Sequence, residues 1–318
     1  MVSVICMALY ARLPRAIVAG LFVTLLLTRP GIPALLTFRA MGDAPYANWE
    51  INGIRNDILE FRSPDAFAIH VGDIQGGWAP DCPESMYQSR RDLFLESELP
   101  VFIIPGDNEW NDCTNPAEAW QHWETHIGRF DENWSHGFNV ARQDVRDENF
   151  AFVDSGVLFL GINMVGGTMH DASEWMQRMT ENAEWVRNNF QSFADHVTSA
   201  VVFGHTVPHG GIRTQFRDEF IPVVADFAKP VLYLQGDFHY WQVDHPYPEI
   251  PNLTRVILEG GSSTPIRVTV TDDPDNPFLF DRDPMPMPEP TTLCLLALGG
   301  LLLMARGRRG IPDWRTRT

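Results

Sequence analysis

Basic residues are scarce in this chain. Of its 318 residues, 24 are Lys or Arg, whereas 41 are Asp or Glu. The terminal segments 1–34 and 291–318 hold eight of the basic residues, so residues 35–290 carry 16 basic and 40 acidic side chains, a formal charge of −24. A surface of this sign repels polyanions, so binding to nucleic acid is not expected and a nuclease is a disfavoured hypothesis. The acidic surplus reflects either metal-binding carboxylates or solubility alone.

Cysteine is equally scarce. Cys6 and Cys294 lie in apolar terminal runs, which leaves only Cys82 and Cys113 for the rest of the chain. Each of these two follows an apolar run and a Gly-Asp pair by a few residues. The spacing is compatible with a disulfide between neighbouring loops in an oxidising compartment, and equally with two free thiols. A hydrophobic content of 44% is enough for a sizeable core, in one large domain or two modest ones.

Long apolar runs are confined to the two ends. Near the N-terminus, Arg12 and Arg15 precede the apolar run 16–27, a pattern typical of a secretory signal. The sequence around Ala34 is a poor cleavage site, so residues 1–34 are either a signal peptide or an uncleaved N-terminal anchor.

At the C-terminus a Pro-rich spacer, 281–290, is followed by the apolar run 291–305 and then by three arginines. The run is shorter than the ~20 residues that a spanning helix usually needs, and it has no polar face. This order of Pro-Glu-Pro, short apolar helix and arginines resembles the PEP-CTERM sorting tail of bacterial exosortase substrates. The resemblance implies retention in the membrane through residues 291–318, processing by sorting machinery, and delivery to the cell surface or outside the cell.

Between these ends, residues 35–280 show alternating strand and helix patterns, which predict a layered α/β fold with mixed sheets. Residues 128–149 have no clear period and are either loops over a site or a structural insertion. No internal repeat is visible. The expected strands are 34–40, 66–71, 101–104, 150–153, 157–162, 200–203, 231–235, 255–258 and 266–270, and the expected helices are 47–61, 85–95, one beginning at 115, 173–193 and 215–227.

Five of the expected strands end in the same way, with a glycine followed by an acidic residue or a histidine. Ligands in open α/β sheets bind beyond the carboxyl ends of the strands, and glycine allows the sharp turn that this position needs. Several carboxylates gathered there would repel one another unless cations lay among them. Asp and His are common ligands of divalent metals, so the pattern predicts a metal site. The endings place Asp43, Asp73, Asp107, His205 and Asp237, with His239 two residues after the last.

The order of these endings resembles the five motif blocks of the calcineurin-like metallophosphoesterases. The resemblance covers residues 36–245 and implies a four-layer α/β-β/α sandwich of two mixed sheets with two divalent metal ions. Carried over by position, it implies that Asp43 and His239 bind the first metal and that Asp73 bridges both. It implies that the second metal is bound by Asp107, His205 and Asp237.

Two departures from the family pattern bear on activity. Pro45 stands where the family has a histidine ligand, which leaves Tyr46 or water to complete the first metal site. Asn108 stands where the family has a histidine that contacts the phosphate and protonates the leaving group. Asn108 donates a hydrogen bond but cannot act as a general acid. Asp in place of Asn at 107 and of His at 237 favours Mn, Fe or Mg over Zn.

These features predict an exported, metal-dependent phosphoester hydrolase that acts on a small phosphoester with Asp73 and Asn108 at its catalytic centre. The alternative is a metal-binding surface or matrix protein with weak or no catalysis. Glu109 is expected to orient a neighbour rather than to bind metal. Trp110, Tyr240 and Trp241 either line the site or pack in the core.

Overall fold

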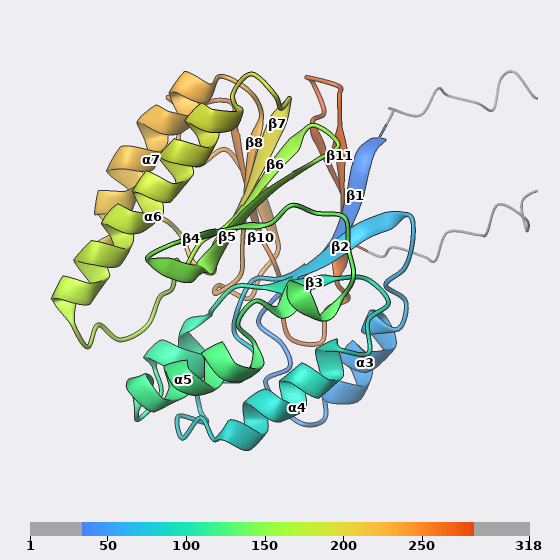
Figure 1. Ribbon diagram of the computed structural model, residues 1–318, viewed down its shortest axis with the longest axis vertical. Coiled ribbons are helices and arrows are strands. Elements are labelled where there is room, and N and C mark those ends of the chain that lie inside the picture. The colour runs from blue at the N-terminus through green and yellow to red at the C-terminus, as the bar shows by residue number, and fades with distance from the viewer. Residues whose placement is uncertain (1–33, 283–318) are drawn as a thin grey trace, which may run out of the picture. The chain divides into compact units, whose positions relative to one another are not determined.

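The computed structural model of the chain describes residues 34–282 (Figure 1). The predicted segments 1–34, 281–290 and 291–318 therefore lie almost wholly outside the described residues. Within 34–282 no helix is both long enough and apolar enough to cross a bilayer. The predictions of a signal or anchor, a spacer and a sorting tail remain predictions.

Two mixed sheets form the centre of the fold. The five-stranded sheet has the order β12-β11-β1-β2-β3, with β1, β2 and β3 parallel and β11 and β12 antiparallel to their neighbours. Its strands are β1 (Ala34–Met41), β2 (Asp65–His70), β3 (Val101–Ile103), β11 (Ile266–Thr271) and β12 (Phe278–Asp281).

The seven-stranded sheet has the order β4-β5-β6-β7-β8-β10-β9, in which β6, β7, β8 and β10 are parallel. Strands β5 and β6 form an antiparallel hairpin. The strands are β4 (Ala141–Gln143), β5 (Arg146–Asp154), β6 (Val157–Gly161), β7 (Ser199–Phe203), β8 (Val231–Gln235), β9 (Gln242–Asp244) and β10 (Leu253–Ile257).

Helices cover the outer face of each sheet (Figure 1). One pair, α6 (Ala172–Phe193) and α7 (Arg213–Phe227), packs on the seven-stranded sheet. The other helices, α3 (Ile51–Ile58), α4 (Glu84–Phe94) and α5 (Pro116–His126), pack on the five-stranded sheet. A third core cluster, rich in phenylalanine, fills the space between the sheets. The predicted four-layer sandwich of two mixed sheets is confirmed.

Local sequence signals explain several of these elements. Asn115 caps α5, the helix predicted to begin at 115, by accepting a hydrogen bond from the Glu118 amide, and Pro116 occupies the first helical position. The strands β6, β7 and β8 are buried along their whole length, as expected for parallel strands covered on both faces. Short elements were missed: the edge strands β4, β9 and β12, the 3₁₀-helix η3 (Phe130–Asn133) and the π-helix η2 (Asp107–Asn111).

Residues 128–149 serve a structural purpose. Phe138 packs against Phe67, Phe102 and Phe152 in the core between the sheets. Trp134 donates a hydrogen bond to the Ser97 carbonyl. Of the two interpretations of this segment, these contacts favour the structural insertion.

Candidate metal centre

The parallel strands place the six predicted ligands at one edge of the two sheets. Asp43, Asp73 and Asp107 follow β1, β2 and β3, and His205 and Asp237 follow β7 and β8. Four of the predicted ligands, Asp43, Asp73, Asp237 and His239, have φ between 53° and 72°. They are half of the non-glycine residues with positive φ in the described chain. Such backbone strain gathers at functional sites, so its concentration here marks this edge independently of side-chain type.

Glycines make the close approach of these turns possible. A Cβ on Gly106 would lie 2.1 Å from the Asp73 amide nitrogen and 2.2 Å from its Oδ1. A Cβ on Gly72 would lie 2.6 Å from the Gly106 nitrogen, and one on Gly236 would lie 2.2 Å from Asp43 Oδ2. A Cβ at Gly72 or Gly106 would meet backbone atoms, and one at Gly236 would displace the Asp43 side chain. The glycines before Asp73, Asp107 and Asp237 thus make room for a neighbouring ligand turn.

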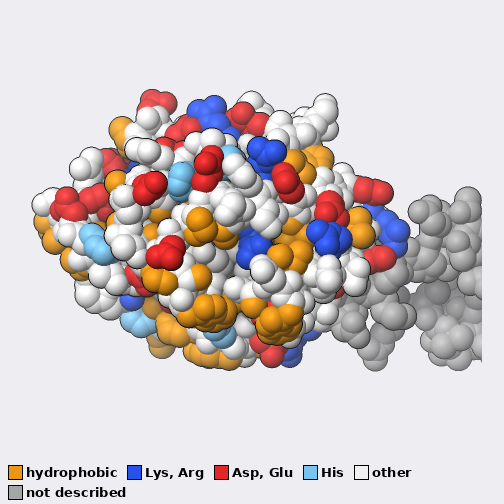
Figure 2. All heavy atoms as spheres, turned by 90° about the horizontal axis from the view of Figure 1, so that it is seen from below, with side chains coloured by type: hydrophobic (Ala, Val, Ile, Leu, Met, Phe, Trp, Pro, Cys, Tyr) orange, Lys and Arg blue, Asp and Glu red, His pale blue; other side chains and the backbone are white. Residues whose placement is uncertain are grey.

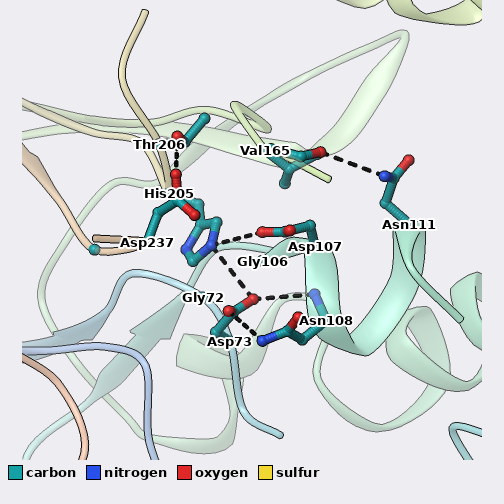
Figure 3. Close-up of polar contacts among 12 residues, drawn as sticks. Gly72, Asp73, Gly106, Asp107, Asn108, Asn111, Val165, His205, Thr206 and Asp237 are labelled. Atoms are coloured by element: carbon teal, nitrogen blue, oxygen red, sulfur yellow. Dashed lines mark hydrogen bonds and ion pairs between the residues drawn. The ribbon is translucent and has the colours of Figure 1, made fainter. Parts of the chain in front are cut away.

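His205 lies at the centre of the cluster (Figure 3). Its Nδ1 lies 2.8 Å from the Val71 carbonyl, which fixes the ring orientation, because a carbonyl can only accept. Its Nε2 then faces Asp107 Oδ1 at 2.8 Å and Asp73 Oδ1 at 3.3 Å. Asp237 and His239 both contact Asp43. The Asp237 amide donates to Asp43 Oδ1 at 2.9 Å, and His239 Nε2 lies 3.4 Å from the same oxygen.

Three buried ligand atoms of this cluster make no hydrogen bond of good geometry: Asp43 Oδ2, and Asp107 Oδ1 and His205 Nε2, which face each other as an ion pair at 2.8 Å. A buried polar atom without a good hydrogen bond is costly, and bound metal ions would satisfy these atoms. Ligand atoms of Asp43, Asp73 and His205 lie within 4.8 Å of one another, as do those of Asp107, His205 and Asp237. The donors are carboxylate oxygens and imidazole nitrogens, so the residues fit a divalent metal.

The charges of the cluster depend strongly on one another. Burial raises the pKa of Asp73 well above its usual value, and the charges of Asp107, Glu109 and Asp43 raise it further against the opposing effect of His205. Burial lowers the pKa of His205, but the surrounding carboxylates outweigh burial and raise it well above its usual value. Without added positive charge the cluster therefore retains protons, which cations would displace.

Tyr46 is the residue that approaches the first predicted metal site. Its hydroxyl lies 3.0 Å from Asp73 Oδ2, 3.2 Å from Asp43 Oδ1 and 2.7 Å from His239 Nε2. Burial and the charges of Asp73 and Asp43 raise the pKa of Tyr46, so the phenol is neutral here and has one proton to donate. Tyr46, one of the two candidates for the ligand missing at Pro45, thus lies beside the first predicted metal site.

Glu109 and His70 support the ligand turns from within the core. The buried Glu109 carboxylate accepts hydrogen bonds from the backbone amides of Gly106 (2.6 Å), Asp73 (3.2 Å) and Ile74 (3.3 Å). These bonds agree with the orienting role expected for Glu109. His70 Nε2 lies 2.6 Å from the Ala44 carbonyl, and its Nδ1 accepts from the Gly72 amide. Burial lowers the pKa of His70 to about 4, so it is neutral.

Asn108 lies on the π-helix and forms hydrogen bonds with Asp73, the predicted bridging ligand. Its Nδ2 donates to Asp73 Oδ2 at 2.5 Å, and its amide nitrogen donates to Asp73 Oδ1 at 3.1 Å. The Asn108 carbonyl accepts from Gln75 Nε2 at 2.7 Å. Asn108 therefore orients the Asp73 carboxylate and keeps one amide hydrogen for another acceptor.

Cys82 and Cys113 form a disulfide, with Cα atoms 5.9 Å apart. The bond joins the loop after β2 to the segment after the π-helix. The two segments that carry Asp73 and Asp107 are thus covalently linked just beyond the site.

The aromatic residues considered from the sequence do not all line the site. Trp110 packs against Trp120, at 4.6 Å between ring centroids, and against the Arg178 guanidinium. Trp241 packs against Phe280, and Tyr240 is exposed beside Phe238. The sequence reasoning missed Thr206, whose hydroxyl donates to Asp237 Oδ2. Its position directly after His205 is the only signal that could have identified it.

Comparisons with known proteins give only distant similarity. No protein-family model matches the chain, and no curated protein matches its sequence. Among solved structures, GAP50, the anchor in the inner membrane complex of Plasmodium, has 10% identity and a TM-score of 0.47 over 78% of this chain and 88% of its own. The 5'-nucleotidase of Candida albicans has 15% identity and a TM-score of 0.46, over 78% of this chain and 51% of its own.

The sulfate thiohydrolase SoxB, solved from Thermus thermophilus, has 10% identity and a TM-score of 0.42, over 81% of this chain and 47% of its own. The chain thus spans about half the length of these last two proteins. At this level of similarity, the functional argument depends on the residues of the site.

Proposed function

We propose that the chain is a metal-dependent phosphoester hydrolase with two divalent metal ions. The observation that carries the proposal is the cluster of predicted ligands, of which Asp43, Asp73, Asp107 and His205 are buried and in which three ligand atoms make no hydrogen bond of good geometry. Asp237 is partly buried and His239 is exposed. Asp43 and His239, with Tyr46 beside them, would hold the first metal, and Asp107, His205 and Asp237 the second. Asp73 lies between the two groups and would contact both. The acidic donor set favours Mn, Fe or Mg over Zn.

Bound metal ions supply an activated water and polarise the phosphoryl oxygens, so no protein nucleophile is needed. The protein's residues orient and balance this centre. Asn108 holds the Asp73 carboxylate with one amide hydrogen and offers the other to a phosphoryl oxygen. Glu109 fixes the backbone of both ligand turns.

Asn108 cannot protonate a leaving group, so the reaction should depend on leaving-group quality. We expect activity on aryl phosphates and much weaker activity on alkyl phosphates, whose alkoxide leaving groups need a proton. Equal rates on the two ester types would contradict this role of Asn108 and would point to another acid.

The decisive experiment is metal analysis of the purified protein together with assays on 4-nitrophenyl phosphate and bis(4-nitrophenyl) phosphate. The test variant is Asp73→Asn, and Asp195→Asn, an exposed aspartate beyond α6, is the matched control. We expect bound metal and turnover in the wild type and in Asp195→Asn. In Asp73→Asn both should be lost, because the shared ligand of the two ions is weakened.

A second candidate function is a metal-binding protein with little or no catalysis. The observation that favours it is the Tyr46 hydroxyl, which occupies the space beside Asp43, Asp73 and His239 where water would otherwise enter. Bound metal without turnover on either ester would support this candidate over the hydrolase.

We also propose that the chain is exported, held in the membrane through residues 291–318 and delivered to the cell surface by sorting machinery. The disulfide supports an oxidising location, since disulfides are rare in the cytosol. The excess of acidic residues supports the expectation that nucleic acid is not a partner, and no broad basic surface is visible on the face shown in Figure 2. Cell fractionation and mass spectrometry of the mature ends would test export and processing.

A further inference from the structure

Arg213 is the more exposed of the two described arginines that lack an ionic partner. Among residues 34–282, every arginine except Arg90 and Arg213 forms an ion pair with a carboxylate. Arg90 is buried and donates to the Ile74 and Pro45 carbonyls, so its role is structural. Arg213 is half-buried at the start of α7, in a chain with a large surplus of carboxylates. An unpaired guanidinium in such surroundings needs an explanation.

The guanidinium of Arg213 lies at the ligand-bearing edge of the seven-stranded sheet. Its Nε donates to the His209 carbonyl at 3.3 Å and its Nη1 to the Val165 carbonyl at 3.5 Å. Both bonds are long and both acceptors are uncharged. The loops that supply them follow β7 and β6, so Arg213 lies across two loops beside the candidate metal centre. Most of its donor capacity remains unused.

Gly166 lies between Arg213 and Asp107, a predicted ligand of the metal centre. A Cβ on Gly166 would lie 3.6 Å from Arg213 Nη1 and 3.7 Å from both carboxylate oxygens of Asp107. The space beside this glycine is therefore bordered by the free guanidinium on one side and by a predicted metal ligand on the other. Burial raises the pKa of Asp107, but His205, and to a lesser degree Arg213, outweigh it and lower this pKa. The charge of Arg213 thus acts directly on the site.

We propose that Arg213 binds the non-bridging oxygens of the substrate's terminal phosphoryl group beside Gly166 and so selects phosphate monoesters over diesters. The inference rests on the proposed function and names its substrate class. A guanidinium presents parallel N–H donors that match two phosphate oxygens. A monoester carries close to two negative charges at neutral pH, because its second pKa is about 6, whereas a diester carries one. A cationic group among four carboxylates therefore favours the more highly charged ester.

The test compares Arg213→Gln and Arg213→Lys with Arg217→Gln, all as full-length, metal-loaded protein. Arg217 lies one turn further along α7 and is paired with Asp218, so it is a matched control. For Arg213→Gln we expect kcat/KM on 4-nitrophenyl phosphate to fall about 100-fold, as for loss of one transition-state donor. On bis(4-nitrophenyl) phosphate the fall should be below about fivefold. Arg213→Lys should restore part of the loss, and Arg217→Gln should leave both activities unchanged.

A second variant tests the location of the phosphoryl group without removing the charge. Gly166→Ala adds a methyl group at ordinary contact distance from Arg213 and Asp107, so the fold should tolerate it. We expect binding of inorganic phosphate, measured by calorimetry, to weaken about tenfold in Gly166→Ala and in Arg213→Gln at unchanged metal content. Equal losses on both esters, or unchanged phosphate binding in both variants, would overturn the proposal.

The two proposals fail separately. If the metal-loaded wild type hydrolyses neither ester, the proposed function fails. Arg213 is then judged by phosphate binding alone: tenfold weakening in Arg213→Gln supports the anion site, and unchanged affinity refutes it.

Discussion

The disulfide between Cys82 and Cys113 gives the most direct quantitative prediction. The perturbation is the double substitution Cys82→Ser with Cys113→Ser, which avoids leaving a single free thiol. The bond closes a loop with a sequence separation of 31 residues. In the chain-entropy treatment, a closed loop of this length stabilises the folded state by about 3.7 kcal/mol at 25 °C. In a domain of this size that loss corresponds to a fall in Tm of about 7–15 °C.

The same substitution should also weaken metal binding, for a local reason. Gln75 Nε2 lies 2.8 Å from Cys82 Sγ and donates to the Asn108 carbonyl, so the disulfide supports the segment that orients Asp73. Loss of such support around a metal ligand typically lowers metal affinity 10–100-fold. The assays are calorimetric unfolding with and without a chelator, and titration of the apo protein with Mn²⁺.

Reductant provides the control for this prediction. It should lower the Tm of the wild type toward that of the double variant and should leave the double variant unchanged. A fall in Tm below about 2 °C with unchanged Mn²⁺ affinity would refute the reasoning, because it would mean that the two loops hold their positions without the covalent link.

Three further predictions concern side chains around the ligands. Tyr46→Phe removes the hydroxyl that lies beside three predicted ligand residues, so Mn²⁺ affinity at one of the two sites should fall about tenfold. An unchanged Mn²⁺ titration curve would exclude a contribution of the phenol to metal binding. Glu109→Gln replaces a carboxylate that accepts three backbone hydrogen bonds, so the free energy of unfolding of the apo protein in urea should fall by about 2–3 kcal/mol. An unchanged urea midpoint would mean that the Glu109 carboxylate does not stabilise the ligand turns. Burial lowers the pKa of His70 from 6.5 to about 4. The unfolded chain therefore takes up a proton as pH falls from about 6.5 to 4 while the folded chain does not, and stability should fall by about 3 kcal/mol across that window. His70→Gln should remove this part of the pH dependence in chelator-treated protein, and an identical pH profile in the variant would refute it.

Five of the six predicted ligand positions could be predicted from the sequence because each depends on a local signal, and His239 lies two residues beyond the last of them. A buried apolar run, a glycine and then Asp or His place a side chain at a strand end, and parallel strands bring their ends together. The capped start of α5 at Asn115-Pro116 was predictable for the same reason, since cap residues act within one turn.

Features that depend on distant parts of the chain could not be predicted in this way. The disulfide was left undecided, because only the fold brings Cys82 and Cys113 to a Cα distance of 5.9 Å. The π-helix Asp107–Asn111 has five residues and hence no periodicity to detect. The absence of a carboxylate partner for Arg213 among the described residues is likewise a property of the folded chain, and no local sequence signal indicates it.

The contacts around the glycines indicate that the backbone contributes to the spacing of the ligand turns, beyond the identity of the individual ligands. A Cβ on Gly72, Gly106 or Gly236 would lie within 2.6 Å of an atom of a neighbouring ligand turn. At Gly72 and Gly106 these contacts include main-chain atoms, and Glu109 accepts hydrogen bonds from the Gly106 and Asp73 amides, so the backbone sets the spacing of these two turns. Replacement of a His by Asp at such a position changes the charge and the metal preference of the site but leaves its geometry in place. If the proposed function holds, Pro45 and Asn108 would alter the chemistry of the site while the ligand turns keep their places, so metal binding would persist without an acid at position 108 to protonate the leaving group.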